Sequence, residues 1–249
     1  MSSFQISGNI VRIKEKEVCG GTISVENDRI KSIVYDNKTY DSFILPGFVD
    51  AHVHIESSML VPKEFGRIAP IHGTVATISD PHEIGNVLGV EVVQYMIDNG
   101  KESPFKFHFG APSCVPATKD ENNGETVTAK DIASFLNHPR VLGLGEVMDY
   151  PSVIYGDDDI HKKIELMRNK KIDGHAPDIL GKDLNAYIAA GVTTDHECTF
   201  VESMLARIKR GMYVHLREGS QTRNTSALLK GLNKDNIHRV LFCTDDKHP

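Results

Sequence analysis

The sequence of 249 residues contains only four cysteines, Cys19, Cys114, Cys198 and Cys243, and no two of them form a CxxC pair. This spacing provides neither a disulfide framework nor a thiolate zinc site, so we expect four reduced thiols. Runs of lysine or arginine are also missing, and the formal net charge is −6. An acidic chain without basic runs is a poor partner for nucleic acid or an anionic membrane surface, so we expect a small-molecule ligand.

Long apolar segments are missing as well. The longest apolar stretches, such as residues 43–49, fall well short of the ~18 residues that a membrane span requires. The chain begins MSSFQISGNI, which lacks the basic segment and apolar core of a secretory signal. We therefore expect a cytoplasmic globular protein with no membrane segment.

Histidine is abundant, with twelve residues, and several stand beside Asp or Glu in segments that otherwise resemble buried strands. Imidazole and carboxylate groups placed together in this way are the first indication of metal chemistry.

The first 45 residues contain short β-type runs at residues 9–13, 22–25, 30–35 and 42–45, separated by turn formers. We predict a small antiparallel sheet over residues 1–45. Pro46-Gly47 ends this pattern, and a second domain is predicted over residues 46–249.

In the second domain, apolar runs of about five residues alternate with amphipathic segments, as in βαβ units of a parallel sheet. Eight strands are predicted, at residues 48–53, 75–79, 105–109, 141–145, 171–174, 192–195, 212–216 and 240–244. The clearest helices are predicted at residues 89–98, 129–137, 159–169, 179–190, 200–209 and 225–232. An open doubly wound sheet would give the same alternation. Polar residues at the carboxyl ends of the strands favour an α/β fold of the (β/α)₈ TIM-type barrel class.

The chain ends at Pro249, directly after the eighth predicted strand, without room for the helix that should follow. We expect a chain whose C-terminal part is missing. The missing part would also cover the apolar face of the small N-terminal sheet, which needs a partner to bury it.

The first predicted barrel strand ends in Asp50-Ala51-His52-Val53-His54. Because strand side chains alternate, Asp50, His52 and His54 point to one face, into the barrel mouth. Two imidazoles at i and i+2 can hold one cation, with Asp50 in a supporting position behind them. An isolated HxH pair indicates a metal site only weakly, so the prediction of a metal site depends on the residues at the other strand ends.

Four further strand ends carry metal-binding residue types. Glu146 directly follows a buried apolar run, where an unpaired charge is costly. His175 and His196 end the fifth and sixth strands, and Asp245-Asp246 ends the eighth. Nitrogen and oxygen donors without sulfur suit two divalent ions such as Mn, Fe or Zn. Spacing alone does not distinguish Asp245 from Asp246 as a ligand.

These segments carry a family resemblance. LPGFVDAHVHIESS, GEVMD, DGHAP, TDHE and CTDD resemble the amidohydrolase superfamily. HVHIESSM, SDPHEIGNV, LGEVMDYPSV, KKIDGHAPDILGKDLNAYIAAGVTTDHE and LREGSQTRN resemble the bacterial adenine deaminases, over nearly the whole chain. The resemblance implies a (β/α)₈ barrel with a small β domain built from both chain ends. It also implies hydrolysis of adenine to hypoxanthine and ammonia by a metal-activated hydroxide.

By this resemblance two metals, Mn or Fe in the first place and Zn as an alternative, share Glu146 as a bridging ligand. Many superfamily members have a carboxylated lysine on strand four, and here Glu146 takes its place. The remaining ligands implied are His52 and His54 with Asp245 on the more buried metal, and His175 and His196 on the second. The first aspartate after strand eight is the usual ligand, which favours Asp245 over Asp246.

Deamination requires proton transfers to and from the reacting ring. Asp245 is the candidate for deprotonating the water, and Glu146 and His82 are further catalytic candidates. Asp80 and Glu83, in Asp80-Pro81-His82-Glu83 after strand two, are candidates for binding the ring. A histidine there could instead cap the following helix.

Arg217 and Glu218, with Ser220, follow strand seven and are further candidates for substrate contact, with a surface ion pair as the alternative. For the remaining histidines we expect structural roles: His108 and His215 within strands, and His138, His161 and His238 near helix ends or loops. The acidic run at residues 157–159 is explained by the first turn of a helix.

Two alternatives to the deaminase remain open. One is another amidohydrolase, a cyclic-amide hydrolase or amino-sugar deacetylase, which would share the ligands but carry different loops after strands two and seven. The other is a non-catalytic fragment. The resemblance to the superfamily implies a homodimer or larger homo-oligomer for the full-length protein.

Overall fold

The computed structural model describes residues 3–249 and divides the chain into two compact units, Met1–Gly47 and Phe48–Pro249. The boundary predicted from the sequence, between residues 45 and 46, lies two residues before the end of the first unit at Gly47.

The N-terminal unit is a four-stranded sheet in the order β3-β2-β1-β4. Its strands are β1 (Ser3–Arg12), β2 (Glu17–Glu26), β3 (Arg29–Asp36) and β4 (Phe43–Ile44). Strands β1 to β3 form the predicted antiparallel meander, but β4 pairs parallel to β1. The fully antiparallel prediction is wrong for β4, because the chain crosses from one edge of the sheet to the other before β4 begins. The side chain of Asn9 holds this crossing through the carbonyl oxygen of Ser42 at 3.2 Å.

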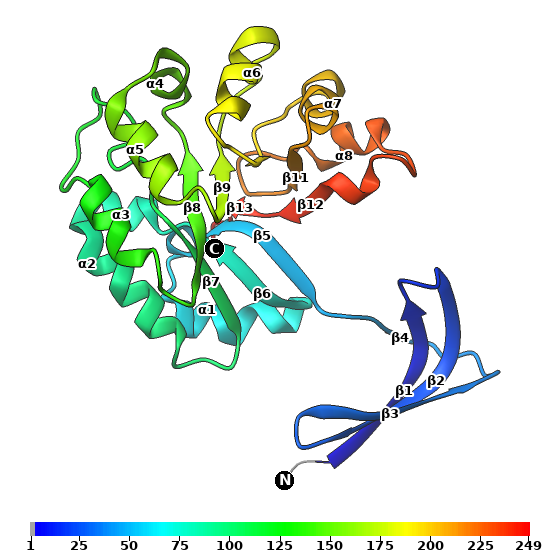
Figure 1. The fold of residues 1–249 in the computed structure, drawn as a ribbon. Coiled ribbons are helices and arrows are strands. Elements are labelled where there is room, and N and C mark those ends of the chain that lie inside the picture. The colour runs from blue at the N-terminus through cyan, green and yellow to red at the C-terminus, as the bar shows by residue number, and fades with distance from the viewer. Residues whose placement is uncertain (1–2) are drawn as a thin grey trace. The chain divides into compact units, whose positions relative to one another are not determined.

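The second unit contains the predicted barrel (Figure 1). Its strands are β5 (Phe48–His54), β6 (Thr74–Ser79), β7 (Lys106–Ala111), β8 (Val141–Val147), β9 (Lys171–Gly174), β10 (Thr194–Asp195), β11 (Tyr213–Arg217), β12 (Val240–Cys243) and β13 (Asp245–Asp246). All pairings are parallel, in the orders β13-β5-β6-β7-β8-β9 and β10-β11-β12. The ring closes because β13 follows β12 directly and Thr193 N–H donates to Ile172 O at 2.9 Å, between β9 and β10. The (β/α)₈ prediction is confirmed.

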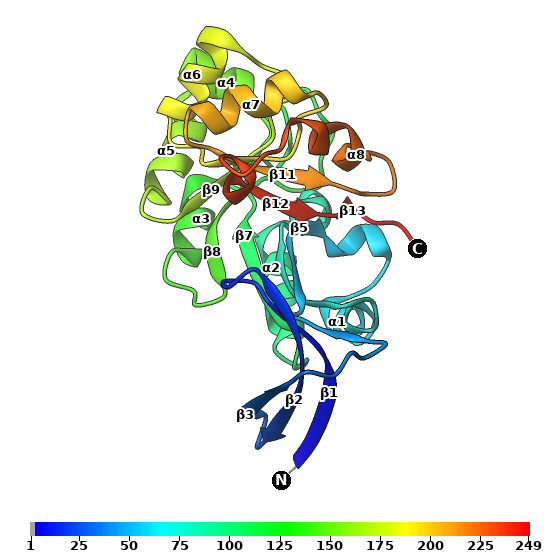
Figure 2. The same cartoon turned by 90° about the vertical axis from the view of Figure 1, so that its right-hand side faces the viewer.

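Helices lie on the outside of these strands, as Figures 1 and 2 show. They are α1 (Pro62–Ile68), α2 (His82–Gly100), α3 (Ala129–Phe135), α4 (Tyr150–Tyr155), α5 (Asp158–Leu166), α6 (Gly181–Ala189), α7 (Val201–Lys209) and α8 (Thr225–Leu228). Short 3₁₀ turns add η1 (Ile55–Ser58), η2 (Ala69–His72), η3 (Leu229–Gly231) and η4 (Ile237–Arg239). None of the helices in residues 3–249 has the length and hydropathy needed to cross a bilayer.

The structure differs from the predicted helices in four places. The sequence missed α1 and α4, which are only seven and six residues long and therefore show little periodicity. Helix α2 begins at His82, earlier than predicted, and bends at Gly89, whose φ of 72° is not helical. The helix predicted over residues 225–232 changes to the 3₁₀ turn η3 after Leu228. As expected, Asp157 caps α5, accepting a hydrogen bond from Asp159 N–H at 3.0 Å.

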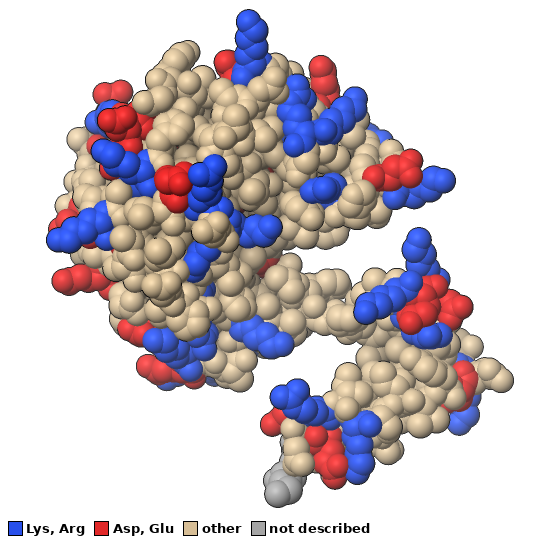
Figure 3. Space-filling model, in the orientation of Figure 1, with Lys and Arg blue, Asp and Glu red and all other residues tan. Residues whose placement is uncertain are grey.

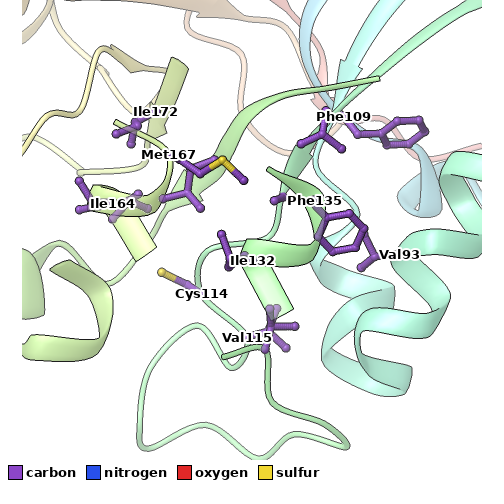
Figure 4. Packing of buried hydrophobic residues seen from close by; sticks show 14 of the residues in the cluster. Val93, Phe109, Cys114, Val115, Ile132, Phe135, Ile164, Met167 and Ile172 are labelled. Atoms are coloured by element: carbon purple, nitrogen blue, oxygen red, sulfur yellow. The ribbon is translucent and has the colours of Figure 1, made fainter. Parts of the chain in front are cut away.

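The main hydrophobic core of the second unit packs strands against helices. Phe109 of β7 lies near Val93, Ile132 and Phe135 of the covering helices, all at most 3% exposed (Figure 4). This packing fixes the carboxyl ends of the strands, where the polar residues predicted for the site are found. On the face of this unit seen in Figure 3, basic and acidic side chains are interspersed.

Candidate metal centre and active site

The barrel brings together side chains that are far apart in the sequence. They come from β5, from the end of β8, from the segments after β9 and β10, and from β13. In the part of the chain that the structure describes, these residues form overlapping sets whose ligand atoms lie within 4.8 Å of one another. The predicted ligands found in these sets are His52, His54, Glu146, His175, His196 and Asp245.

His52 and His54 point toward each other from β5, both nearly fully buried. The Nδ1 atom of His52 lies 2.8 Å from Asp173 Oδ2, and that of His54 lies 2.8 Å from the carbonyl oxygen of Asp80. Since these oxygens accept hydrogen bonds, each Nδ1 donates, and a neutral ring then has its lone pair on Nε2. The two Nε2 atoms lie 3.1 Å apart. Lone pairs this close repel unless a cation lies between them, so the pair has the arrangement of two ligands of one metal ion.

Glu146 lies between the two groups of histidines. Its Oε1 is 3.1 Å from His54 Nε2. Its Oε2 is 2.5 Å from His175 Nδ1 and 3.2 Å from His196 Nε2. The two oxygens of one buried carboxylate thus face two separate sets of nitrogen ligands.

The two aspartates at the end of the eighth strand have different partners. Asp245 Oδ1 lies 3.1 Å from His54 Nε2. Asp246 Oδ1 instead accepts a hydrogen bond from Ser57 at 2.5 Å. Asp245 has a φ of 57°, in the left-handed region that non-glycine residues seldom adopt. This turn, between β12 and β13, directs its carboxylate toward the histidines.

In the centre, neighbouring carboxylates and imidazoles shift each other's pKa values. Burial alone would lower the pKa of His52, but the carboxylate of Asp173 raises it to about 9. Burial would raise the pKa of Glu146, but hydrogen bonds from His175, His196 and His54 hold it well below its usual range. Without a cation His52 therefore carries a proton that offsets the charge of Asp173, and a metal ion must displace this proton to bind.

Asp80 and His82 occupy different places around Glu146. Asp80 is buried and its Oδ2 accepts the backbone N–H of Glu146 at 2.8 Å. Gly145 permits this approach, because a Cβ there would lie 2.4 Å from Asp80 Oδ2. The side chain of His82 makes no capping bond to α2 and lies 3.4 Å from Glu146 Oε1. The helix-cap alternative for His82 is therefore wrong.

A polar cavity of about 250 Å³ adjoins the centre. Its lining is His54, His82, Glu83, Glu146, Met148, His175, Arg217, Gly219, Gln221, Thr222, Asp245 and Asp246. Of the predicted substrate-binding residues, Glu83 and Arg217 line this cavity. Asp80 does not, because it lies behind Glu146. Glu218 does not line the cavity either. It comes directly after Arg217, so its side chain points to the other side, where it is exposed beside an apolar groove of β12.

Arg217 is buried, so the surface ion-pair alternative is also wrong. Its Nη1 pairs with Glu197 and with Asp245 Oδ2, the latter at 2.5 Å. Ser220 is half-buried outside the cavity lining, where its hydroxyl accepts the backbone N–H of His248.

Sequence reasoning missed two residues that the structure places in the site. Asp173 supports His52, in the position expected for Asp50. Asp50 instead accepts the N–H groups of His52 and Thr244, joining β5 to the end of β12. Glu197 adjoins the predicted ligand His196 in sequence and pairs with Arg217. The available signal was their place in the DGHAP and TDHE segments.

The donor set fits two divalent cations. Arg217 is the one lysine or arginine, among residues 3–249, that pairs with the carboxylates of the centre. The carboxylates of Glu146, Asp173 and Asp245 face histidines instead, so with neutral imidazoles two divalent ions would supply the positive charge that these buried groups need.

Comparison with known proteins adds a family match. Residues 43–247 match the model of the amidohydrolase family. The chain is 48% identical over 248 residues to a protein of Sulfurovum sp. (strain NBC37-1) named adenine deaminase, covering 99% of this chain and 46% of that protein. It is 44% identical over 248 residues to an adenine deaminase of Clostridium acetobutylicum, covering 97% and 44%. The chain thus spans less than half the length of these curated relatives.

Solved structures resemble the fold at low sequence identity. The ochratoxinase of A. niger superposes with a TM-score of 0.55 at 12% identity, covering 100% of this chain and 76% of that one. A solved amidohydrolase superposes with a TM-score of 0.50 at 12% identity, covering 98% and 78%. At these identities the likeness concerns the fold alone.

Proposed function

This chain belongs to the amidohydrolase family, and from that premise we propose that it hydrolyses adenine to hypoxanthine and ammonia with two divalent metal ions. The observation that carries the proposal is Glu146, whose two oxygens face two different sets of histidines. A carboxylate placed in this way could serve two metal ions at once. The relatives named adenine deaminase support adenine as the substrate.

His52, His54 and Asp245 would hold one ion, and His175 and His196 the other, with Glu146 between them. The absence of sulfur from this set favours Mn or Fe, with Zn as an alternative. Divalent ions bound here supply Lewis-acid chemistry that lowers the pKa of water to near neutrality.

The chain's own residues then have three tasks: to take a proton from the attacking water, to protonate the ring nitrogen beside C6, and to let the amine leave as ammonia. Asp245 is our candidate for the first task. Its Oδ1 faces the convergent nitrogens, while Arg217 holds its other oxygen. His82 is our candidate for the second, because it lines the cavity within 3.4 Å of Glu146 Oε1 and has a buried Nδ1 without a hydrogen-bond partner.

The polar lining of the cavity suits a heteroaromatic base with several ring nitrogens. Glu83 lines it beside Asp246, and the hydroxyl of Ser57 lies within hydrogen-bond distance of both carboxylates. We assign Glu83 to the ring and Asp80 to holding the backbone of Glu146. A homodimer or larger assembly stays a prediction.

The proposal is tested by adenine-dependent release of ammonia from the purified chain loaded with Mn²⁺, with metal content measured on the same sample. His52→Ala and Glu146→Ala should lose metal and turnover together, because the remaining ligands are left as unpaired buried groups. His72→Ala is a matched control, since His72 is exposed in η2.

The outcomes separate the alternatives. Turnover with about two metal ions per chain, lost in both variants, supports the proposal. Metal without turnover of adenine, but with turnover in a panel of cyclic amides and N-acetyl amino sugars, identifies a different amidohydrolase. Neither metal nor turnover would identify a non-catalytic fragment.

A further inference from the structure

Arg217 lies where a further cation would otherwise fit. The ligand atoms of His196, Glu197 and Asp245 form one of the sets within metal-binding distance of one another. The guanidinium of Arg217 is paired with both carboxylates of this set. The arginine therefore takes the position of the positive charge that these two carboxylates need when buried.

We propose that Arg217 is a built-in cation that closes the His196, Glu197 and Asp245 set to metal and so limits the centre to two ions. This rests on the proposed function, because it takes Asp245 as a ligand of the metal pair. It assigns to Arg217 a positioning role in place of the substrate contact expected from the sequence.

The two carboxylate oxygens of Asp245 have different partners. Oδ1 faces His54 at 3.1 Å, and Oδ2 is held by Arg217 at 2.5 Å. A carboxylate with one oxygen so engaged presents a single oxygen to the metal pair. The unusual φ of Asp245, 57°, leaves its direction dependent on such partners.

Glu197 is the second carboxylate that Arg217 restrains. Its Oε1 lies 3.7 Å from both His175 Nδ1 and His196 Nε2, which is too long for a hydrogen bond but close to the predicted ligands. Without Arg217, this oxygen would be a buried anion beside two imidazoles. Such a group recruits a cation.

The surroundings of Arg217 fit this role. The residue is 5% exposed, and its Nε is buried without a hydrogen-bond partner in the described chain. The guanidinium is thus held by its two carboxylates at Nη1, the atom that both pairs share.

The test compares equilibrium binding of Mn²⁺ by the unmodified chain with binding by Arg217→Met and Arg217→Lys. We expect the Met variant to bind one more equivalent than the unmodified chain, while the Lys variant, which keeps the charge, does not. Adding Glu197→Gln to Arg217→Met should remove the extra equivalent. Arg223→Met is the matched control, because Arg223 lies in the loop that follows Arg217 and its Nε donates to the backbone carbonyl of Gly219.

Kinetics with adenine provide the second readout. In Arg217→Met we expect kcat to fall about 100-fold with KM changed less than about threefold, because Asp245 loses its fixed direction. Thermal unfolding of the metal-free variants identifies any that do not fold. If Arg217→Met does not fold, the kcat and the metal count of Arg217→Lys decide whether the proposal holds. An unchanged metal count in folded Arg217→Met overturns the proposal, as does a raised KM with unchanged kcat. Failure of the unmodified chain to deaminate adenine would contradict the proposed function, whereas the metal counts test Arg217 separately.

Discussion

The Nδ1 atom of His52 lies 2.8 Å from Oδ2 of Asp173, a residue 121 positions further along the chain. Asp173 is itself held by Thr194, whose hydroxyl donates to Oδ1 at 2.5 Å. This arrangement fixes which nitrogen of His52 carries the proton and therefore which nitrogen is available to a metal ion. Strands β5, β9 and β10 are thus joined beneath the proposed ligands.

We expect Asp173→Asn to weaken metal binding about 10- to 100-fold, because the imidazole of His52 loses the carboxylate that orients it. Competition with a chelator, measured on variant and unmodified protein, provides the affinity. Asp98→Asn is the control, since Asp98 is exposed on α2 and pairs with Lys101. Equal affinities in all three proteins would show that Asp173 does not orient a metal ligand.

Asp245→Asn and Asp246→Asn should differ sharply in their metal content and in kcat. The first removes the carboxylate that faces His54, so we expect lower metal content and at least a ~100-fold loss of kcat. The second removes the charge of a carboxylate that accepts a hydrogen bond from Ser57 and faces no histidine of the centre, so it should leave the metal content unchanged. Metal analysis of the two variants decides between them, and the reverse pattern would make Asp246 the ligand.

Gly145→Ala tests how closely Asp80 approaches the end of β8. A Cβ at this position would lie 2.4 Å from Asp80 Oδ2, so the carboxylate must move away from the N–H group of Glu146. We expect a loss of stability of about 1–3 kcal/mol and a clear fall in activity. Gly85→Ala is the matched control, because its Cβ would meet its nearest neighbour, Val93, at an ordinary 3.5 Å. Equal unfolding midpoints for the two variants would refute this account.

The stability of the metal-free protein should fall with rising pH. Burial would lower the pKa of His52, but Asp173 raises it to about 9, above its ordinary value of 6.5. Between these values the folded state binds more protons than the unfolded state, so the stabilisation is fully present below pH 6.5 and is lost as the pH rises through 9. The shift corresponds to about 3 kcal/mol from this group.

Urea unfolding of chelator-treated protein from pH 6 to pH 9 measures this effect, and Asp173→Asn should flatten the dependence. Metal affinity should rise over the same range, because the proton must leave before the ion binds. A stability that is independent of pH in the metal-free protein would contradict the pairing of His52 with Asp173.

Much of the candidate site could be predicted because it depends on local rules. Alternation along a strand places His52 and His54 on one face, and the βα repeat places Glu146, His175 and His196 at the same end of the barrel. Each of these statements depends only on spacing within one strand or one repeat. The same rule places the side chains of Arg217 and Glu218 on opposite sides.

The tertiary structure alone decided how the side chains pair across the barrel. The contacts of His52 with Asp173 and of Arg217 with Asp245 depend on the register between strands that are distant in sequence. The kink at Gly89 and the parallel pairing of β4 likewise depend on what the segment packs against. The sequence by itself determined the barrel and the residue types at its mouth, because periodicity and strand-end position are local. Which carboxylate serves which histidine was decided by packing, because such contacts form only once the closed sheet has fixed the distances between strands.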